Sequence, residues 1–196
     1  MEKQRIVLAS GNAHKIKEIQ QMLEDYEIVG YKDLGVDFEI EENGTTFYEN
    51  ALIKAKTVAE ALNLPALADD SGICVKALND EPGIYSARYA GDGVDEHNNQ
   101  LLLKNMQGKT DRRAKFVCCM VFYKPDGTII SSFGETEGEI MDKCYGENGF
   151  GYDPLFFSYD LNQCLGIADA KQKNTISHRY RAIKGLKEKL DQEYKG

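Results

Sequence analysis

The fold is decided first by RIVLASGNAHK, residues 5–15. Residues 5–9, apolar from Ile6 onward, predict a buried strand, and the Ser10-Gly11-Asn12 segment after them predicts a turn. Beyond the turn, apolar residues return at helical spacing, at positions 16, 19, 22 and 23, and Asn12 is a suitable N-cap for that helix. A strand that passes through a short turn into a helix is typical of α/β proteins.

The rest of the chain continues this alternation of strands and helices. Thr46 and Glu49 have the spacing of a capping box, so a second helix is expected to begin near Thr46 and to close at Pro65. Further helices are expected over about 95–106 and from near Ser177, and strands over 66–68, 73–77, 114–123 and 128–133. The glycine-rich residues 134–152 are expected to be mostly strand ends and loops. Helices separated by paired strands predict an α/β fold with a mixed sheet flanked by helices.

The composition is that of one globular domain. The chain has 196 residues, of which 42% are hydrophobic and 29% charged, and a chain of this size can bury roughly 70% of its unfolded surface. The longest apolar run, residues 116–123, is far shorter than a membrane span, and residues 6–9 are too short for a signal-peptide core. The 5 cysteines have no C-x-x-C spacing, which predicts reduced thiols and a cytoplasmic location.

The charge balance bears on the class of partner. Lys and Arg number 24 and Asp and Glu number 32, so the net charge is −8. A protein that binds nucleic acid without sequence preference needs a broad basic face, which this composition does not favour. We therefore expect neither a nucleic acid nor a membrane as partner.

The segment SGNAHK, residues 10–15, is a candidate phosphate-binding turn. Backbone N–H groups at the start of a helix point at whatever lies above it, and Gly11 allows close approach while Lys15 adds positive charge. The spacing is not that of a P-loop. An ordinary N-cap turn with a solvated lysine is the alternative.

Acidic residues gather at two places. In ADDSG, residues 68–72, Asp69 and Asp70 repel each other at the end of a predicted buried strand, a cost that a divalent cation or a catalytic task would offset. Only one of the two is expected to reach a cleft, because neighbouring strand residues point to opposite faces. A turn with a capping Asp is the alternative. Glu39, Glu41 and Glu42 form the second group, either as ligands of Mg²⁺ or as a solvated loop.

An aromatic motif and a basic cluster point to a planar, electron-rich ligand. In GFGYDP, residues 149–154, Phe150 lies between glycines that provide no packing, so its ring can stack on a base or form an aromatic corner. Cations at a helix N-terminus oppose the helix dipole at about 0.3–1 kcal/mol each, and an anion or electron-rich ligand would remove that conflict. Side chains that swing into water are the alternative. The cluster near the last predicted helix comprises Lys171, Lys173, His178, Arg179 and Arg181.

Taken in order, six segments resemble the inosine triphosphate pyrophosphatase family, which hydrolyses non-standard purine nucleoside triphosphates. They are SGNAHK (10–15), ENALIKA (49–55), ADDSG (68–72), PGIYSARYAG (82–91), GFGYDPLF (149–156) and SHR (177–179). The resemblance implies an elongated α/β fold of two lobes with the active site in a cleft, formed by one domain of residues 1–196. It also implies Mg²⁺-dependent cleavage between the α- and β-phosphates, yielding a monophosphate and pyrophosphate, and a homodimer. Ser10 stands where many members carry Thr, and both keep the hydroxyl.

The resemblance also implies roles for individual residues. Asp70 resembles the general base and a metal ligand, and Ser71 resembles a substrate contact. Glu41 is expected to be the other metal-linked carboxylate, aligned through the spacing of Gly44 and Phe47, with Glu42 as its rival. The phosphate-binding residues would be Ser10, Gly11, Asn12, Ala13, His14, Lys15 and Lys54. The nucleotide-base pocket would comprise Phe150, Gly151, Tyr152, Asp153, Lys173, His178 and Arg179.

These roles predict hydrolysis of ITP, dITP and XTP by a water that Asp70 deprotonates, with no covalent nucleophile. A pyrophosphatase for another modified nucleotide is one rival interpretation, and a nucleotide-binding regulatory protein without turnover is another. The acidic residues at 41 and 70 favour turnover, because a protein that only binds gains nothing from a general base.

Overall fold

The computed structural model describes residues 2–196. Within these residues, seven strands form one sheet in the order β2-β1-β3-β4-β5-β6-β7. β1 pairs in parallel with β2 and β3, whereas β6 pairs antiparallel with β5 and β7, so the sheet is mixed, as predicted. The strands are β1 (Gln4–Leu8), β2 (Tyr26–Gly30), β3 (Ala66–Val75), β4 (Arg113–Tyr123), β5 (Ile129–Ile140), β6 (Phe156–Ser158) and β7 (Gln163–Cys164).

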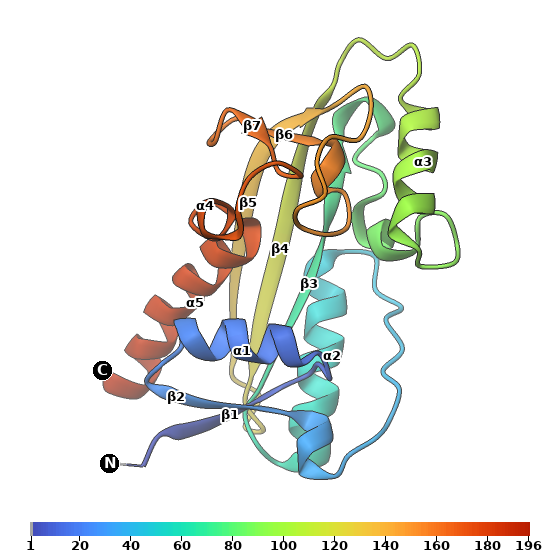
Figure 1. The fold of residues 1–196 in the computed structure, drawn as a ribbon. Helices are drawn as coiled ribbons and strands as arrows, with labels where there is room; N and C mark the ends of the chain where they lie inside the picture. The colour runs from blue at the N-terminus through green and yellow to red at the C-terminus, as the bar shows by residue number, and fades with distance from the viewer. Residues whose placement is uncertain (1) are drawn as a thin grey trace. The chain divides into compact units, whose positions relative to one another are not determined.

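Helices flank the sheet (Figure 1). The α-helices are α1 (Ala13–Met22), α2 (Phe47–Leu62), α3 (Asp95–Asn105), α4 (Ala170–Asn174) and α5 (His178–Lys195). Short 3₁₀ helices are η1 (Tyr31–Leu34), η2 (Lys76–Leu78), η3 (Gly83–Arg88) and η4 (Asp153–Leu155). None of the helices found in residues 2–196 combines the length and the apolar character that crossing a membrane requires.

The chain forms two compact units. The first consists of the residues up to Asp70 together with Cys119–Phe133 and Ala182–Gly196, and the second of Ser71–Cys118 and Gly134–Arg181. β3, β4 and β5 each contribute residues to both units. The candidate phosphate-binding residues belong to the first unit and the candidate base-binding residues to the second.

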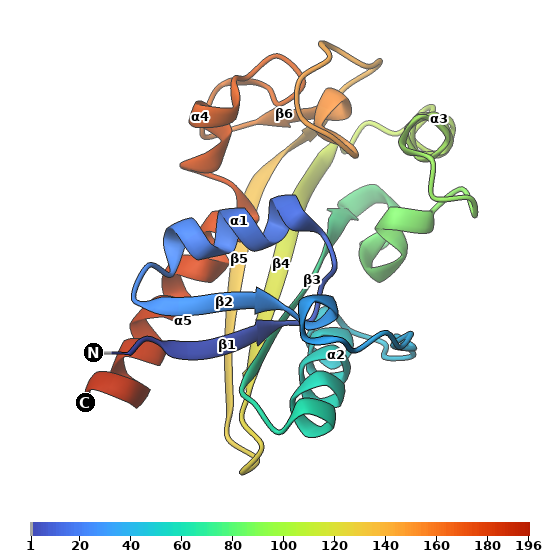
Figure 2. The same ribbon diagram turned by 60° about the horizontal axis from the view of Figure 1, so that its bottom comes forward.

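In the first unit, β1 and β2 lie side by side with their directions parallel (Figure 2). α1 contacts β2 and α2 contacts β1. α2 buries small side chains, including Ala51, Ala55 and Ala59, in a core that also contains Val7 of β1 and Val121 of β4. Small residues on this helix face bring α2 close to the strands, and this close packing fixes the position of Lys54.

The first two helices are capped largely as the sequence predicts. The Asn12 side chain accepts hydrogen bonds from the backbone N–H groups of His14 and Lys15 at 3.0 and 3.2 Å. The Thr46 side chain accepts from the Glu49 N–H at 3.1 Å, while the Glu49 carboxylate accepts from Thr45. α2 ends at Leu62, before Pro65, because Asn63 turns the chain with φ +52°.

The second unit has its own core, in which Ile73 and Val75 of β3 pack with Leu102 and Met106 from α3 and its end. The expectation of separate strands over 66–68 and 73–77 is wrong. β3 runs unbroken from Ala66 to Val75, so Asp69 and Asp70 lie within a strand rather than at a turn, and β3 ends before residue 77. β5 is longer than the strand expected over 128–133 and ends at Ile140, after which residues 141–152 form the expected loop.

Gly138 explains why a glycine occurs inside β5. A Cβ at this position would lie 2.1 Å from the carbonyl oxygen of Phe157 and 2.7 Å from the ring of Phe156. The glycine therefore permits the close approach of β6 and does not mark a loop.

Candidate functional site

In the first unit, SGNAHK joins β1 to α1 and is both a capped helix start and a candidate anion cradle. The Ser10 hydroxyl accepts a hydrogen bond from the Asn12 N–H at 3.2 Å, and the Asn12 side chain satisfies the N–H groups of His14 and Lys15. An anion at this turn would compete with these contacts. Gly11 leaves room above the backbone, where the Lys32 side chain now lies, 3.0 Å from the position of a Cβ on Gly11.

Lys15 is not the solvated lysine of the alternative interpretation. Its side chain is 23% exposed, and its ammonium lies 2.9 Å from Oδ1 of Asp69, whose side chain is buried. This ion pair joins the first turn of α1 to β3. Asp69 thus has a structural partner in Lys15.

Lys54 is also held by oxygen atoms rather than solvated. Its side chain is 17% exposed, and its ammonium donates to the carbonyl oxygen of Asp69 at 2.6 Å and lies 2.8 Å from Oε1 of Glu42. Burial acts to lower the pKa of Lys54, but the charges of Asp69, Glu42 and Asp70 outweigh it and raise the pKa. Lys54 therefore keeps its positive charge inside the protein.

Asp70 is a carboxyl group whose environment shifts its pKa upward. Burial, together with the charges of Glu42 and Asp69, raises its pKa to about 6 against the opposing effects of the Lys54 charge and an Asn50 hydrogen bond. Within residues 2–196, its buried Oδ2 atom has no hydrogen-bond partner. A half-buried carboxyl with an unpartnered oxygen is suited to accept a proton or to bind a cation.

The second acidic residue near Asp70 is Glu42 rather than Glu41. Glu42 is partly buried, pairs with Lys54 and contributes to the raised pKa of Asp70. Glu41 is exposed, as is Glu39 two residues before it. Of the two candidates, Glu42 is therefore the one that lies in the surroundings of Asp70 in this structure.

In the second unit, Asp153 organises the aromatic motif. The buried Asp153 carboxylate accepts a hydrogen bond from the Phe150 N–H at 3.0 Å and forms an ion pair with Lys173. The Lys173 ammonium lies 4.3 Å from the centroid of the Phe150 ring. Phe150 itself is 64% exposed, so its ring is available for stacking, and Lys173 is placed to contact a ligand bound there.

A hollow of about 350 Å³ adjoins these residues. Phe150 and Lys173 contribute to its lining, together with Asn148, Gly149, Ala168, Asp169, Ala170 and Asn174. A hollow of this size is at the lower end of those that hold small molecules.

The basic cluster is divided among several partners. Lys171 and Lys173 lie in the last turn of α4, where cations suit the helix dipole, so the predicted conflict does not apply to them. Arg181 donates to the Glu135 carbonyl oxygen at 2.8 Å and pairs with Asp160 at 3.1 Å. His178 stacks on Phe116 with ring centroids 5.1 Å apart, and Arg179 is partly buried next to it.

Three further predicted site residues, Tyr152, Gly151 and Ser71, either form hydrogen bonds that involve the backbone or lie within a strand. Tyr152 is only 6% exposed, and its hydroxyl donates to the Ser86 carbonyl oxygen at 2.6 Å, which makes it a core residue. Gly151 has φ +58° and is bound through its backbone to α3. Ser71 is partly buried in β3, directly after Asp70.

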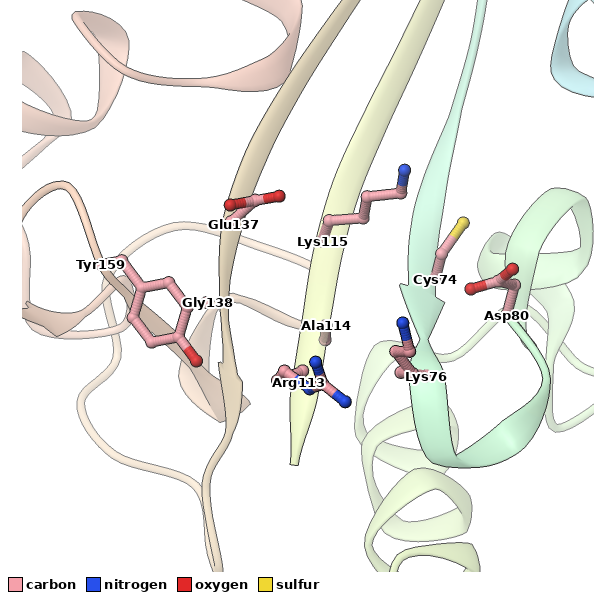
Figure 3. Close-up of a pocket in the computed structure, with 9 residues that line it drawn as sticks. All are labelled: Cys74, Lys76, Asp80, Arg113, Ala114, Lys115, Glu137, Gly138 and Tyr159. Carbon is pink, nitrogen blue, oxygen red and sulfur yellow. The ribbon is translucent and has the colours of Figure 1, made fainter. Parts of the chain in front are cut away.

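A separate cavity of about 440 Å³ in the second unit contains none of the predicted site residues (Figure 3). Two of its cations are already paired, Arg113 with Asp111 and Lys115 with Glu135. Burial raises the pKa of its Cys74 thiol to about 11, so the thiol is protonated at neutral pH. Lys76, Arg113 and Lys115 line this cavity together with Glu137 and Tyr159, which gives it a mixed polar surface.

Comparison with known proteins gives consistent results. A protein of Staphylococcus aureus named dITP/XTP pyrophosphatase is 47% identical over 189 residues, which cover 96% of this chain and 97% of the relative. The solved structure of the Staphylococcus aureus Ham1 protein matches with a TM-score of 0.93 at 46% identity, covering 97% of this chain and all of that one. A HAM1 protein from Coxiella burnetii matches with a TM-score of 0.91 at 40% identity, covering 96% and 99%.

These matches confirm the resemblance noted in the six sequence motifs and the mixed α/β fold that it implies. The sequence pattern of the Ham1 family extends over residues 6–189, which include all the candidate site residues. The chain therefore belongs to the Ham1 family.

Proposed function

We propose that this protein hydrolyses non-standard purine nucleoside triphosphates such as ITP, dITP and XTP to the monophosphate and pyrophosphate. The observation that carries the proposal is the half-buried Asp70 carboxyl, with a pKa raised to about 6 and an unpartnered oxygen, next to the cationic Lys54. Relatives named dITP/XTP pyrophosphatase at 47% identity support the substrate class.

The triphosphate is bound by residues of the first unit. The turn at residues 10–15 supplies backbone N–H groups, and Lys15 and Lys54 supply positive charge in a protein whose net charge is −8. Both lysines are held by carboxylates in the structure, so they are already oriented before substrate arrives. Ser10 contributes a hydroxyl group to this set, and Ser71, with which the second unit begins, contributes another.

The purine base is bound by residues of the second unit. The exposed Phe150 ring stacks on the base, and Lys173, His178 and Arg179 donate hydrogen bonds to its acceptor atoms. Asp153 fixes the position of Lys173 and of the Phe150 backbone, which supports a positioning role for Asp153. We further propose that residues 1–196 form a single pyrophosphatase domain with two lobes.

Asp70 acts as the general base. It accepts the proton of the water that attacks the α-phosphorus, in line with the departing pyrophosphate. A carboxyl with a pKa of about 6 is ionised at neutral pH and is more basic than an ordinary aspartate. Lys54 stabilises the ionised form of Asp70 and the charge that develops on the phosphate oxygens.

The acidic residues also fit a magnesium ion. Asp70 offers an unpartnered buried oxygen and Glu42 a second carboxylate of the kind Mg²⁺ prefers. Residues 2–196 contain no group of three or more His, Cys, Asp or Glu side chains that could hold a metal alone. Mg²⁺ commonly takes one or two carboxylates and fills its other positions with water and substrate phosphates. When bound, it supplies neutralisation of the phosphate charge.

The test is pyrophosphate release from a panel of ITP, dITP, XTP, GTP, ATP and a modified pyrimidine triphosphate, with Mg²⁺ and with EDTA. The proposal expects turnover of the first three only in the presence of Mg²⁺. Turnover of a modified pyrimidine triphosphate alone would favour the rival enzyme, and tight binding without turnover would identify a binding protein.

The family resemblance further supports a cytoplasmic homodimer. The PGIYSARYAG segment carries an exposed Tyr85, over whose ring Arg88 lies at 5.5 Å, and such residues are common interface anchors. Light scattering at micromolar concentration is expected to give a mass twice the 22.0 kDa of the chain. A mass equal to that of one chain would contradict the dimer.

A further inference from the structure

We propose that Asp95 and Asn99 of α3 are positioning residues that hold the Phe150 ring ready to stack on the base. The inference rests on the proposed function, because it assigns to these residues a role in base binding. Neither residue belongs to any of the motifs that carry the family resemblance.

Both residues bind the glycine that follows Phe150. Oδ2 of Asp95 accepts a hydrogen bond from the Gly151 N–H at 2.9 Å, and the Asn99 side-chain amide donates to the Gly151 carbonyl oxygen at 3.0 Å. A spacing of four residues places both side chains on one face of α3. The two peptide groups that flank the Gly151 Cα are therefore fixed by one helix face.

The Phe150 ring needs such support, because packing does not provide it. The ring is 64% exposed, and it lies between Gly149 and Gly151, both with positive φ. Glycines of this kind leave a loop with much conformational freedom in the absence of other contacts. A loop that is ordered before the ligand arrives loses less entropy when the ligand binds.

The polar contacts around Phe150 form a complete set. Asp153 binds the Phe150 N–H, Asp95 and Asn99 bind the Gly151 N–H and carbonyl, and the Tyr152 hydroxyl binds Ser86. Residues 150–153 are thus each held by a hydrogen bond, formed either by their backbone with another side chain or by their own side chain. Asp95 and Asn99 are the members of this set that come from outside the loop and face the residue next to the ring.

Asn99 is also an unusual residue if the only role of α3 is to pack against the core. Its side chain is 5% exposed, and in the part of the chain that the structure describes its Oδ1 atom has no hydrogen-bond partner. A buried amide with one unsatisfied atom is unfavourable for stability, so the helix would pack better with an apolar residue here. Packing of α3 instead rests on Leu102, which lies in the core of the second unit.

The experiment compares Asp95→Ala and Asn99→Leu with Glu96→Ala as the matched control. Glu96 also lies in the first turn of α3, so its loss removes the same favourable interaction with the helix dipole without touching Gly151. Asp95→Asn is the rescue variant, because its amide oxygen can still accept from the Gly151 N–H. Thermal unfolding of each variant identifies any that fails to fold.

We expect Asp95→Ala and Asn99→Leu to raise the KM for ITP about 5- to 10-fold while kcat changes less than about twofold. Glu96→Ala and Asp95→Asn are expected to match the unmodified protein. Competitive inhibition by inorganic tripolyphosphate, which has no base, is expected to remain unchanged in every variant. A general loss of folding would weaken tripolyphosphate as well.

A double variant tests whether the effect passes through the ring. If Asp95 acts by positioning Phe150, then Asp95→Ala is expected to add no further rise in KM to Phe150→Ala. Additive effects would overturn the inference, as would equal KM values for Asp95→Ala and Glu96→Ala. Absence of turnover in the unmodified protein would refute the proposed function but not this inference. In that case, calorimetry measures the affinity of the same variants for ITP, and the same criteria apply to the measured affinities.

Discussion

The Asp70 carboxyl lies half-buried in β3, within electrostatic reach of Lys54, Glu42 and Asp69. Its environment favours the protonated form, which is unfavourable for the stability of the folded protein at neutral pH. The same environment makes the ionised carboxylate a better base. Stability and activity are therefore expected to respond in opposite directions to a change at this residue.

Asp70→Asn is expected to lower kcat by roughly 10²–10⁴-fold, because the amide cannot accept the proton of the attacking water. Steady-state rates of pyrophosphate release measure this loss, with Asp69→Asn as the comparison. If Asp70→Asn kept near-normal kcat and Asp69→Asn lost it, the general base would be Asp69.

The same variant is expected to be more stable than the unmodified protein above pH 6. The folded-state pKa of about 6 exceeds the ordinary value of 3.8, so folding becomes less favourable as the pH rises between these values and the full cost is present above pH 6. Partial screening by solvent limits this cost to about 1–2 kcal/mol. Urea unfolding in EDTA at pH 4 and pH 8 is expected to show the gain at pH 8 only; an equal difference at both pH values would contradict the titration of Asp70.

Lys54→Met is expected to move the acid limb of the kcat/KM profile to higher pH. The Lys54 charge lowers the pKa of Asp70 against the effect of burial, so its removal raises that pKa further. Lys56→Met is the matched control, because Lys56 is on the same helix and pairs with the exposed Glu60 at 4.0 Å. An unshifted acid limb in Lys54→Met would show that Asp70 does not limit the rate at low pH.

β3 and β5 show how neighbouring strands decide an element's extent. Asp69, Asp70 and Gly72 have low strand propensity, which predicts a turn, yet β3 continues through them as part of the sheet, beyond Ala66 and Leu67, which pair with β1. The glycines of β5 likewise predict loop, yet Gly138 pairs with Ser158 of β6. Propensity describes a segment alone, and pairing depends on residues far away in sequence.

Gly138→Ala is expected to destabilise the protein by roughly 1–3 kcal/mol, because the new Cβ would overlap the Phe157 carbonyl oxygen and the Phe156 ring. Urea unfolding measures the change. Glu137→Ala, at the exposed neighbouring position, is the control and is expected to stay within about 0.5 kcal/mol of the unmodified protein. A Gly138→Ala protein of full stability would mean that β6 lies farther from β5.

The segment of α4 and α5 that carries the donors Lys173 and Arg179 is expected to select purines with a 6-keto group. At position 6 of the purine, ITP presents an acceptor oxygen, whereas ATP presents an amino group that donates. The protein's donors are then left unpaired with ATP, and each unpaired donor costs roughly 1–3 kcal/mol of binding free energy. The kcat/KM for ITP is thus expected to exceed that for ATP by about 100-fold or more. Arg179→Ala should reduce this ratio, whereas Phe150→Ala should weaken both substrates alike. Similar kcat/KM values for ITP and ATP would contradict this assignment.

For the molecule as a whole, the sequence predicts the long elements well and the long-range contacts poorly. Asn12, the 3.6-residue periodicity of the last helix and the strand over 114–123 are local signals, and α1, α5 and β4 confirm them. β6 and β7 have three and two residues, too few for a periodic pattern, and they form only by pairing.

The same limit applies to the candidate site. Local motifs identified the turn at residues 10–15, Lys54 and Asp70, whereas the choice between Glu41 and Glu42 depends on the course of a loop without periodicity. Asp95 and Asn99 lie 56 and 52 residues from Gly151, so no local signal connects them. The sequence feature that points to Asp95 and Asn99 is their position, as acidic and amide residues, in the first half of the helix predicted over about 95–106.

Hydrolysis of ITP in ¹⁸O-labelled water tests the central claim most directly, because it reports both the products and the phosphorus atom that water attacks. The account predicts IMP that carries the label, together with unlabelled pyrophosphate, in the presence of Mg²⁺. Labelled inorganic phosphate with IDP, or label in the pyrophosphate, would contradict attack at the α-phosphorus and with it the proposed activity.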